Sequence, residues 1–323
     1  MRSFPVLCSA TTAAVLAACS TDVRNQGSSP NCSTTIEATY PVDGSSNFYY
    51  RDAIEFYLSS PDPSARVMTD IEGEQYTSED GKTILFVPSQ ALEPVTEYEV
   101  GLDYCRGMPT ISFTTSELGS EIASFDTIEG NTYIFHLDAA RYTTGGEVAQ
   151  ALLAIFNKEV LIQILEIADT SIAMRGAVGE SLNGEVEQDI CYRTLDLEEL
   201  GVDSADFYYE DAELVMDFYH TELSFLNLLM SGTFAPDGSW IGGVSLFANI
   251  DVRGLSQTLG LGTADDICAF ARELESPCEP CSTDNEDYCI TIAAEKISAT
   301  SLNIDLEQIE LNNSFEECVV EEA

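Results

Sequence analysis

Basic residues are scarce in this 323-residue chain. Lysine and arginine together number 13 against 56 aspartate and glutamate residues, which gives a formal net charge of −43 at pH 7, and only three of the basic residues are lysines. Proteins bind nucleic acids and anionic lipid surfaces through clusters of lysine and arginine. The chain has no such cluster, so we expect no nucleic-acid partner. Its dispersed acidic residues are typical of a solvated surface.

Catalytic signatures are absent as well. The sequence contains no G-x-S-x-G elbow, no H-E-x-x-H pair, no P-loop and no dinucleotide-binding glycine motif. Only two histidines occur, His136 and His220, and both stand among apolar or aromatic residues, which favours structural roles. These absences favour a protein that is not an enzyme. The many carboxylates leave a hydrolase with a glycosidase-type pair as an alternative.

The apolar run at the amino terminus is too short to span a membrane. Arg2 precedes about a dozen apolar or small residues, and no acidic residue occurs before Asp22, whereas a spanning helix needs roughly 20. A positive start, a short apolar stretch and small residues before a cleavage point are typical of an export signal. We therefore expect residues 1–18 to be a signal peptide.

A cysteine closes this run. The tetrapeptide Leu16-Ala17-Ala18-Cys19 resembles the lipobox of bacterial lipoproteins. The resemblance implies cleavage before Cys19 and attachment of a diacylglyceryl group to its thiol, which would anchor the protein to a membrane. Residues 20–31 are polar, so we expect residues 19–31 to be a flexible tether. Ser20 resembles the residue that permits transfer to the outer membrane, on a periplasmic or surface-facing side. The alternative is an ordinary secretory signal.

Cysteine counting agrees with lipidation of Cys19. Cys8 leaves with the signal peptide, and lipid would occupy Cys19. Eight cysteines then remain, which is an even number, as disulfides in an oxidising compartment require. They are Cys32, Cys105, Cys191, Cys268, Cys278, Cys281, Cys289 and Cys318.

Residues 32–116 show the period of β-strands. Apolar and polar residues alternate in 54–58, 97–104 and 111–114, so these strands should have one buried and one solvated face. Turn residues separate the runs at Asp43-Gly44, Pro61-Asp62-Pro63 and Asp80-Gly81. About seven short strands at this spacing predict a β-sandwich.

The same segment resembles a bacterial Ig-like domain of the S-layer type. The resemblance rests on the order of Tyr40-Pro41-Val42-Asp43-Gly44, Asp80-Gly81-Lys82-Thr83 and Phe113-Thr114-Thr115-Ser116. It implies a spacer or interaction module without catalytic residues. It also implies a disulfide between Cys32 and Cys105, which would lie at the same end of an Ig-type sandwich.

Residues 120–323 predict a larger antiparallel β domain, a curled sheet or barrel, with one or two helices. Apolar residues recur at helical spacing in 147–157 and 264–274. Hairpins are predicted over 160–176 and 225–252, the second turning at Ala235-Pro236-Asp237-Gly238-Ser239. For the first arm of the 160–176 hairpin, a continuation of the preceding helix is the alternative. Further extended segments are expected at 214–219, 288–294 and 302–309. We identify no family resemblance for this part.

Six cysteines belong to this second domain, four of them close together. Cys278 and Cys281 have the spacing of a zinc knuckle, and four thiolates suit zinc. A second such pair is missing and the exported context favours oxidation, so disulfides are the preferred interpretation. Among the possible pairings we expect Cys268 with Cys278, Cys281 with Cys289 and Cys191 with Cys318.

An acidic stretch lies between two of these cysteines. Asp284, Glu286 and Asp287 are candidate Ca²⁺ ligands, because hard cations take clustered oxygens. A solvated acidic loop is the simpler interpretation. No other cofactor is expected.

Three hypotheses of function follow. The first is a lipid-anchored envelope protein whose Ig-like module presents the second domain to a protein or glycan partner. The second is a carrier of a lipid or other apolar ligand, for which Ala151 to Leu165 and Leu223 to Met230 supply apolar residues. The third is the carboxylate-dependent hydrolase. The first is preferred, since nothing in the sequence demands the others.

Overall fold

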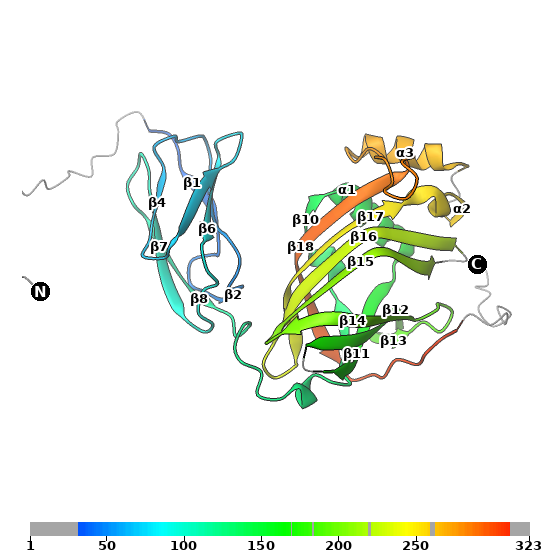
Figure 1. Cartoon of the computed structure of the whole chain (residues 1–323). Coiled ribbons are helices and arrows are strands. Elements are labelled where there is room, and N and C mark those ends of the chain that lie inside the picture. Colours follow the sequence, from blue (N-terminus) through cyan, green and yellow to red (C-terminus); the bar gives the residue numbers. More distant parts are fainter. Residues whose placement is uncertain (1–31, 169, 183, 219–220, 259–261, 311–323) are drawn as a thin grey trace, which may run out of the picture.

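The computed structural model describes residues 32–168, 170–182, 184–218, 221–258 and 262–310. The predicted signal peptide, Cys19, the tether, His220 and Cys318 lie outside these residues. The protein is mainly β, with 51% of the described residues in strands, which confirms the predicted fold class. Figure 1 shows a small sandwich beside a larger curled sheet that carries the helices.

The first domain consists of two four-stranded sheets. The first sheet has the spatial order β1 (Ile36–Tyr40), β3 (Ile54–Leu58), β6 (Thr83–Pro88) and β5 (Gly73–Thr77). The second has the order β2 (Ser45–Phe48), β8 (Thr110–Thr115), β7 (Glu97–Asp103) and β4 (Arg66–Met68). All pairs are antiparallel except β2 with β8. The sheets enclose a core that includes Ile54, Phe56, Val100, Leu102 and Phe113.

In the second domain eight antiparallel strands form a closed barrel. It closes because the last strand pairs with the first as well as with its predecessor. Two short strands flank this ring, β10 (Arg141–Thr144) on β18 and β13 (Glu185–Gln188) on β12. In order around the ring, the strands are β9 (Thr132–Phe135), β11 (Glu159–Ile167), β12 (Ser171–Leu182), β14 (Leu195–Asp203), β15 (Asp206–Phe218), β16 (Thr221–Phe234), β17 (Trp240–Asp251) and β18 (Cys289–Leu302).

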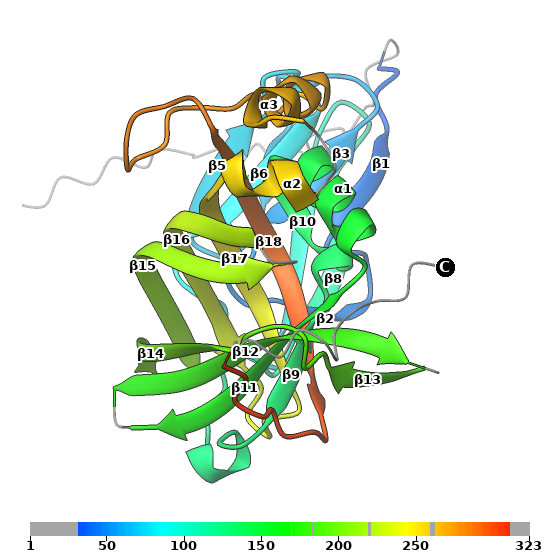
Figure 2. The ribbon, with the colours of Figure 1, turned by 90° about the vertical axis from the view of Figure 1, so that its right-hand side faces the viewer.

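Side chains fill one end of the barrel, and helices cover the other. The filled end holds Tyr133, Phe207 and Phe234 among branched aliphatic residues. At the opposite end lie α1 (Gly146–Phe156), the single turn α2 (Leu255–Thr258) and α3 (Ala264–Glu273), as Figures 1 and 2 show. Short 3₁₀ turns occur at η1 (Phe125–Thr127), η2 (Leu137–Ala139) and η3 (Val252–Gly254). Both predicted helices are therefore present.

The two predicted hairpins are confirmed as β11–β12 and β16–β17. The prediction for the end of the chain was partly wrong. β18 continues through Leu302, since Ile297 and Ala299 pack in the barrel core while Ser298 between them is less buried. Residues 303–310 form no strand. They cross the outer face of the barrel instead, with the Leu306 amide donating to Gln163 and the Glu307 amide to Gln188.

The two domains pack against each other through polar contacts and aromatic rings. Tyr49 Oη and Thr233 Oγ1 lie 2.8 Å apart. Arg51 pairs with Asp206, and Arg141 pairs with Glu55. The alternating pattern predicted that Glu55 faces water. That was wrong, because the barrel domain covers this face of the sandwich and leaves the Glu55 side chain 2% exposed.

Candidate functional site

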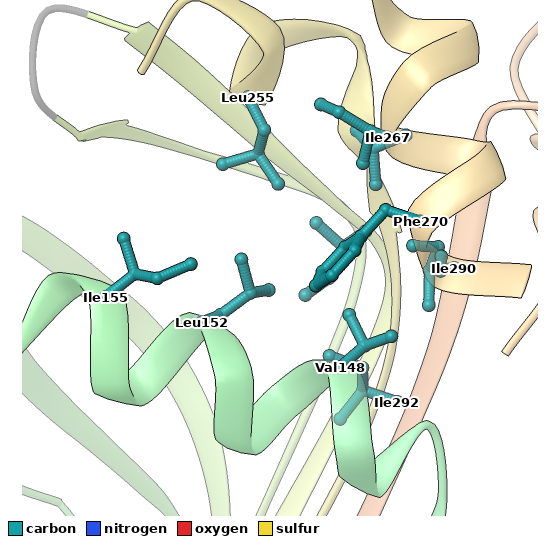
Figure 3. Close-up of a pocket in the computed structure, with 11 residues that line it drawn as sticks. Val148, Leu152, Ile155, Leu255, Ile267, Phe270, Ile290 and Ile292 are labelled. Atoms are coloured by element: carbon teal, nitrogen blue, oxygen red, sulfur yellow. The ribbon is translucent and has the colours of Figure 1, made fainter. Parts of the chain in front are cut away.

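An apolar pocket lies at the helix-covered end of the barrel, between α1, α2, α3 and strands β17 and β18 (Figure 3). Its cavity volume is about 20 Å³, room for about one water molecule, and the rest of the hollow is open to solvent. Every residue of its lining is apolar: Val148, Leu152, Ile155, Ile250, Val252, Leu255, Ile267, Phe270, Ala271, Ile290 and Ile292.

Helical periodicity builds two walls of this pocket. Val148, Leu152 and Ile155 follow one another at i, i+4 and i+7 along one face of α1, and Figure 3 shows them pointing toward α3. A capping box fixes the start of α3: Thr263 Oγ1 accepts from the Asp266 amide, and Asp266 accepts from the Thr263 amide. The α3 helix then directs Ile267 and Phe270 at the pocket.

Two apolar side chains at the mouth are unusually exposed. Ile155 is 54% and Phe270 39% exposed, although the other walls are largely buried. Contiguous exposed apolar surface in a concave site is typical of ligand or partner binding. The lining offers no group for acid–base chemistry or metal coordination. What it can do chemically is to take up an apolar group.

Disulfides brace the segments around this end. Bonds join Cys268 to Cys278 and Cys281 to Cys289, with Cα–Cα distances of 5.4 and 5.0 Å, and a third joins Cys32 to Cys105 at 5.8 Å. These are three of the four pairings that the sequence predicts, and they leave no free thiolates for the zinc alternative at Cys278 and Cys281. Cys191 is also disulfide-bonded. Its predicted partner Cys318 lies outside the described residues.

The candidate calcium ligands are engaged within the loop. Asp284 Oδ2 accepts from Arg253 at 2.5 Å, and Asp284 Oδ1 accepts from the Glu286 amide at 3.0 Å. These contacts, the backbone one first, lower the pKa of Asp284. Within the described ranges no three His, Cys, Asp or Glu residues are placed to hold a metal ion. The structure therefore does not bring Asp284, Glu286 and Asp287 together as a metal site.

A charged cluster at the domain interface was missed by sequence reasoning. Lys296 Nζ lies 3.5 Å from Glu55 Oε1 and 3.6 Å from Asp52 Oδ2, and 3.3 Å above the centre of the Tyr40 ring. Arg141 pairs with Glu55 from β10. The only sequence signal was the rarity of lysine, which makes each one a candidate for a specific contact.

The pKa shifts in this cluster run in opposite directions. Burial opposes the ionisation of Glu55, but hydrogen bonds from Arg141 and Tyr57 outweigh it and hold the pKa of Glu55 below its usual value. At Asp52 burial dominates over the hydrogen bond from Tyr40 and raises the pKa. The cluster therefore favours the ionised form of Glu55 and disfavours the ionised form of Asp52.

The remaining buried carboxylates also have structural partners. Lys158 Nζ donates to Asp189 at 2.6 Å, and Asp62 accepts from the amides of Ser64 and Cys105. His136 Nε2 lies 3.0 Å from Thr300 Oγ1, which agrees with a structural role. The apolar pocket at the helix-covered end has no carboxylate in its lining. The hydrolase hypothesis gains no support from this arrangement.

Comparison with known proteins gives little further guidance. No family model and no curated protein matches the sequence. Among solved structures, an L,D-transpeptidase from Mycobacterium smegmatis matches with 12% identity over 61% of this chain and 76% of that chain, at a TM-score of 0.23. The surface-layer protein rSbsC(31-844) matches with 9% identity at 0.21, and domains 1–6 of SbsC with 8% identity at 0.22. Both SbsC matches cover 85% of this chain and 53% of that chain, about half its length.

One expectation is corrected by these matches. The chain was expected not to be an enzyme, whereas one matched structure is a transpeptidase. At this TM-score the likeness carries no reaction and no active-site residue over to this chain. The structure adds one finding on membranes: none of the helices in the described ranges is long and apolar enough to cross a bilayer.

Proposed function

We propose that this protein is an exported lipoprotein of the cell envelope that binds an alkyl chain in the apolar pocket of its barrel domain. The observation that carries the proposal is the pocket itself, with its wholly apolar lining and the exposed Ile155 and Phe270 at its mouth. A site without polar groups selects its ligand by apolar burial alone.

Export and anchoring are supported by the cysteines. Disulfides persist in oxidising compartments, and the structure holds three of them in the described residues. Lipid at Cys19 would hold the protein at the outer membrane, near a source of alkyl chains. Labelling with an alkyne fatty acid tests the anchor: Cys19→Ala should abolish the label, and Cys8→Ala should retain it. A label that survives Cys19→Ala would refute the anchor.

The sandwich is proposed to be an Ig-like spacer. Its strand orders β1-β3-β6-β5 and β2-β8-β7-β4 correspond to the ABED and CFG sheets of Ig-type sandwiches, with β2 added beside the last strand. Its contacts with β10, β16 and β18 fix the barrel domain on this spacer.

Binding is tested with uncharged probes, because the charge of −43 would bias ionic ones. Nile red fluorescence should rise on mixing with the protein and fall when 1-decanol displaces the dye. Ile155→Asp places a charge at the mouth and Leu152→Phe fills the pocket, so each should weaken decanol binding at least tenfold. Val42→Asp is the matched control, since Val42 is 67% exposed in the sandwich.

The Val42→Asp control distinguishes binding in the pocket from binding to exposed apolar residues elsewhere on the surface. The proposal requires that Val42→Asp leave the affinity unchanged. Equal affinities for all four proteins, or no displacement by decanol, would contradict an alkyl-binding pocket.

A further inference from the structure

The connection between the sandwich and the barrel has an apolar part and an ionic part. No strand of one domain pairs with a strand of the other in the described ranges, and the covalent connection is residues 116–131 between β8 and β9 (Figure 1). Beside this linker, Ala235 and Trp240 of the β16–β17 turn pack with Leu118 against the sandwich core. Domains of one chain move relative to each other unless a large apolar interface prevents it. The polar contacts across the rest of the interface therefore decide whether the domains stay together.

One carboxylate joins the domains at β15. Asp206 pairs with Arg51 of the sandwich and accepts from the Tyr50 hydroxyl at 3.0 Å. Within the barrel it also accepts from Thr233 Oγ1 at 2.6 Å, and Thr233 Oγ1 lies 2.8 Å from the hydroxyl of Tyr49. Protonation of Asp206 would remove the negative charge that Arg51 faces across the interface.

Two carboxylates of the sandwich face cations of the barrel at β10 and β18. Glu55 pairs with Arg141, and its Oε1 lies 3.5 Å from Lys296 Nζ. Asp52 Oδ2 lies 3.6 Å from the same Nζ. The side chains of Glu55 and Lys296 are 2% and 21% exposed. A proton on Glu55 would leave Arg141 and Lys296 short of negative charge at a largely covered site, which is unfavourable.

The other titratable groups around Glu55 do not replace its charge. Glu295 lies 3.4 Å from Arg141 Nε, but both residues belong to the barrel, so this pair does not join the domains. Tyr40 and Tyr57 donate their hydroxyl protons to the two sandwich carboxylates. Burial raises the pKa of both tyrosines, so they stay neutral.

We infer that these contacts form a proton-operated latch: protonation of Glu55 and Asp206 releases the barrel from the sandwich while both domains stay folded. The contact beside the linker acts as the hinge. Each domain keeps a core of its own when the latch is open. At neutral pH the ionised carboxylates hold the interface closed.

The Glu55 shift gives the direction of the pH dependence. Burial opposes the ionisation of Glu55, but hydrogen bonds from Arg141 and Tyr57 outweigh it and lower the pKa. The closed form is therefore fully favoured above the usual value of 4.5 and loses this advantage as pH falls through the lowered value. At Asp52 burial raises the pKa, so its protonation favours the closed form. The latch thus opens through Glu55 and not through Asp52.

Neutral substitutions test the latch at pH 7, where the formal charge of −43 keeps the protein dispersed. Glu55→Gln with Asp206→Asn mimics the protonated latch. The matched control is Asp196→Asn, which removes an ion pair with Arg175 inside the barrel. Small-angle X-ray scattering measures the radius of gyration and the maximum dimension, and hydrogen exchange of β8 and β11 reports whether each domain is folded.

We expect both dimensions to increase in the double variant, with exchange in β8 and β11 as slow as in the wild type. The control and Asp52→Asn should scatter like the wild type. Unchanged scattering of the double variant would overturn the inference, and so would loss of protection throughout either domain. Expansion of the control would show that any lost ion pair opens the molecule, and expansion of Asp52→Asn would contradict the assignment of the latch to Glu55.

Discussion

At the scale of single residues, burial of Glu55 is the clearest departure from local sequence rules. The alternation in β3 places it on the face opposite Ile54 and Phe56, which is correct. That face is covered by another domain, and no pattern within 54–58 reveals this. Arg141 and Lys296, the residues that neutralise Glu55, are distant in sequence. Long-range electrostatic partners are invisible to periodicity.

The opposite pKa shifts of Glu55 and Asp52 predict opposite effects of neutral substitutions. Glu55→Gln leaves Arg141 and Lys296 short of a partner and should lower the free energy of unfolding by about 1–3 kcal/mol at pH 7, since Arg141 is partly solvated. Asp52→Asn removes a carboxylate whose raised pKa shows that its ionisation opposes folding. The free energy of unfolding of the Asp52→Asn variant at pH 7 should therefore equal or exceed that of the wild type.

The pH dependence follows from the sign of the Glu55 shift. A lowered folded-state pKa gives stability that is complete above the usual value of 4.5 and disappears as pH falls through the folded-state value. Urea unfolding of wild type and Glu55→Gln should therefore differ at pH 7 and converge in acid. A difference that grows on acidification would contradict the assignment.

Gly243 is a second residue with a specific steric role. It has φ +59 in β17, and a Cβ there would lie 2.1 Å from the Tyr49 ring of the sandwich. Gly184 also has positive φ, +89, but faces open space. Gly184→Ala should cost about 1 kcal/mol from backbone strain alone. Gly243→Ala should cost at least about 2 kcal/mol because the ring must also move.

Thermal unfolding separates the two contributions. In a Tyr49→Ala background, the cost of Gly243→Ala should fall to that of Gly184→Ala. A cost that is independent of Tyr49 would show that the ring does not lie on Gly243 in solution.

At the scale of elements, local patterns predicted local structure. Helical spacing located α1 and α3, and the turn at 235–239 located the β16–β17 hairpin. Pairings that join distant segments were not predicted, namely β9 with β18 and the strap of 303–310 across the outer wall. From the sequence, an apolar ligand site was predicted only from the apolar residues in 151–165 and 223–230. Of these stretches, only Leu152 and Ile155 line it, because α3, β17 and β18 supply most of the lining.

The disulfides differ in the length of chain that they close. Cys32 and Cys105 are 73 residues apart, whereas Cys281 and Cys289 are 8 apart. In the chain-entropy model, the longer loop contributes about 4 kcal/mol and the shorter about 2.5 kcal/mol. Replacing both cysteines of the first pair by alanine should therefore cost more unfolding free energy than replacing both of the second. Urea denaturation ranks them, and the reverse order would contradict the entropic account.

At the scale of the whole molecule, the sequence predicts two parts, 32–116 and 120–323, but not how they contact each other. The sandwich and the barrel share contacts through Tyr49, Arg51 and Glu55. Three of the 13 basic residues, Arg51, Arg141 and Lys296, are placed at this interface. In so acidic a chain, the placement of three scarce basic residues in ion pairs between the domains favours a fixed orientation of the barrel relative to the sandwich.

The central claim is that the pocket under the helices binds an alkyl chain. Methyl NMR of isoleucine-labelled protein titrated with 1-decanol tests it most directly, because Ile155, Ile267 and Ile292 line the pocket while Ile54 and Ile84 lie in the sandwich core. We predict saturable shifts of the pocket methyl resonances and none in the sandwich. Shifts of equal size in both domains, or none up to the solubility limit of decanol, would contradict the account.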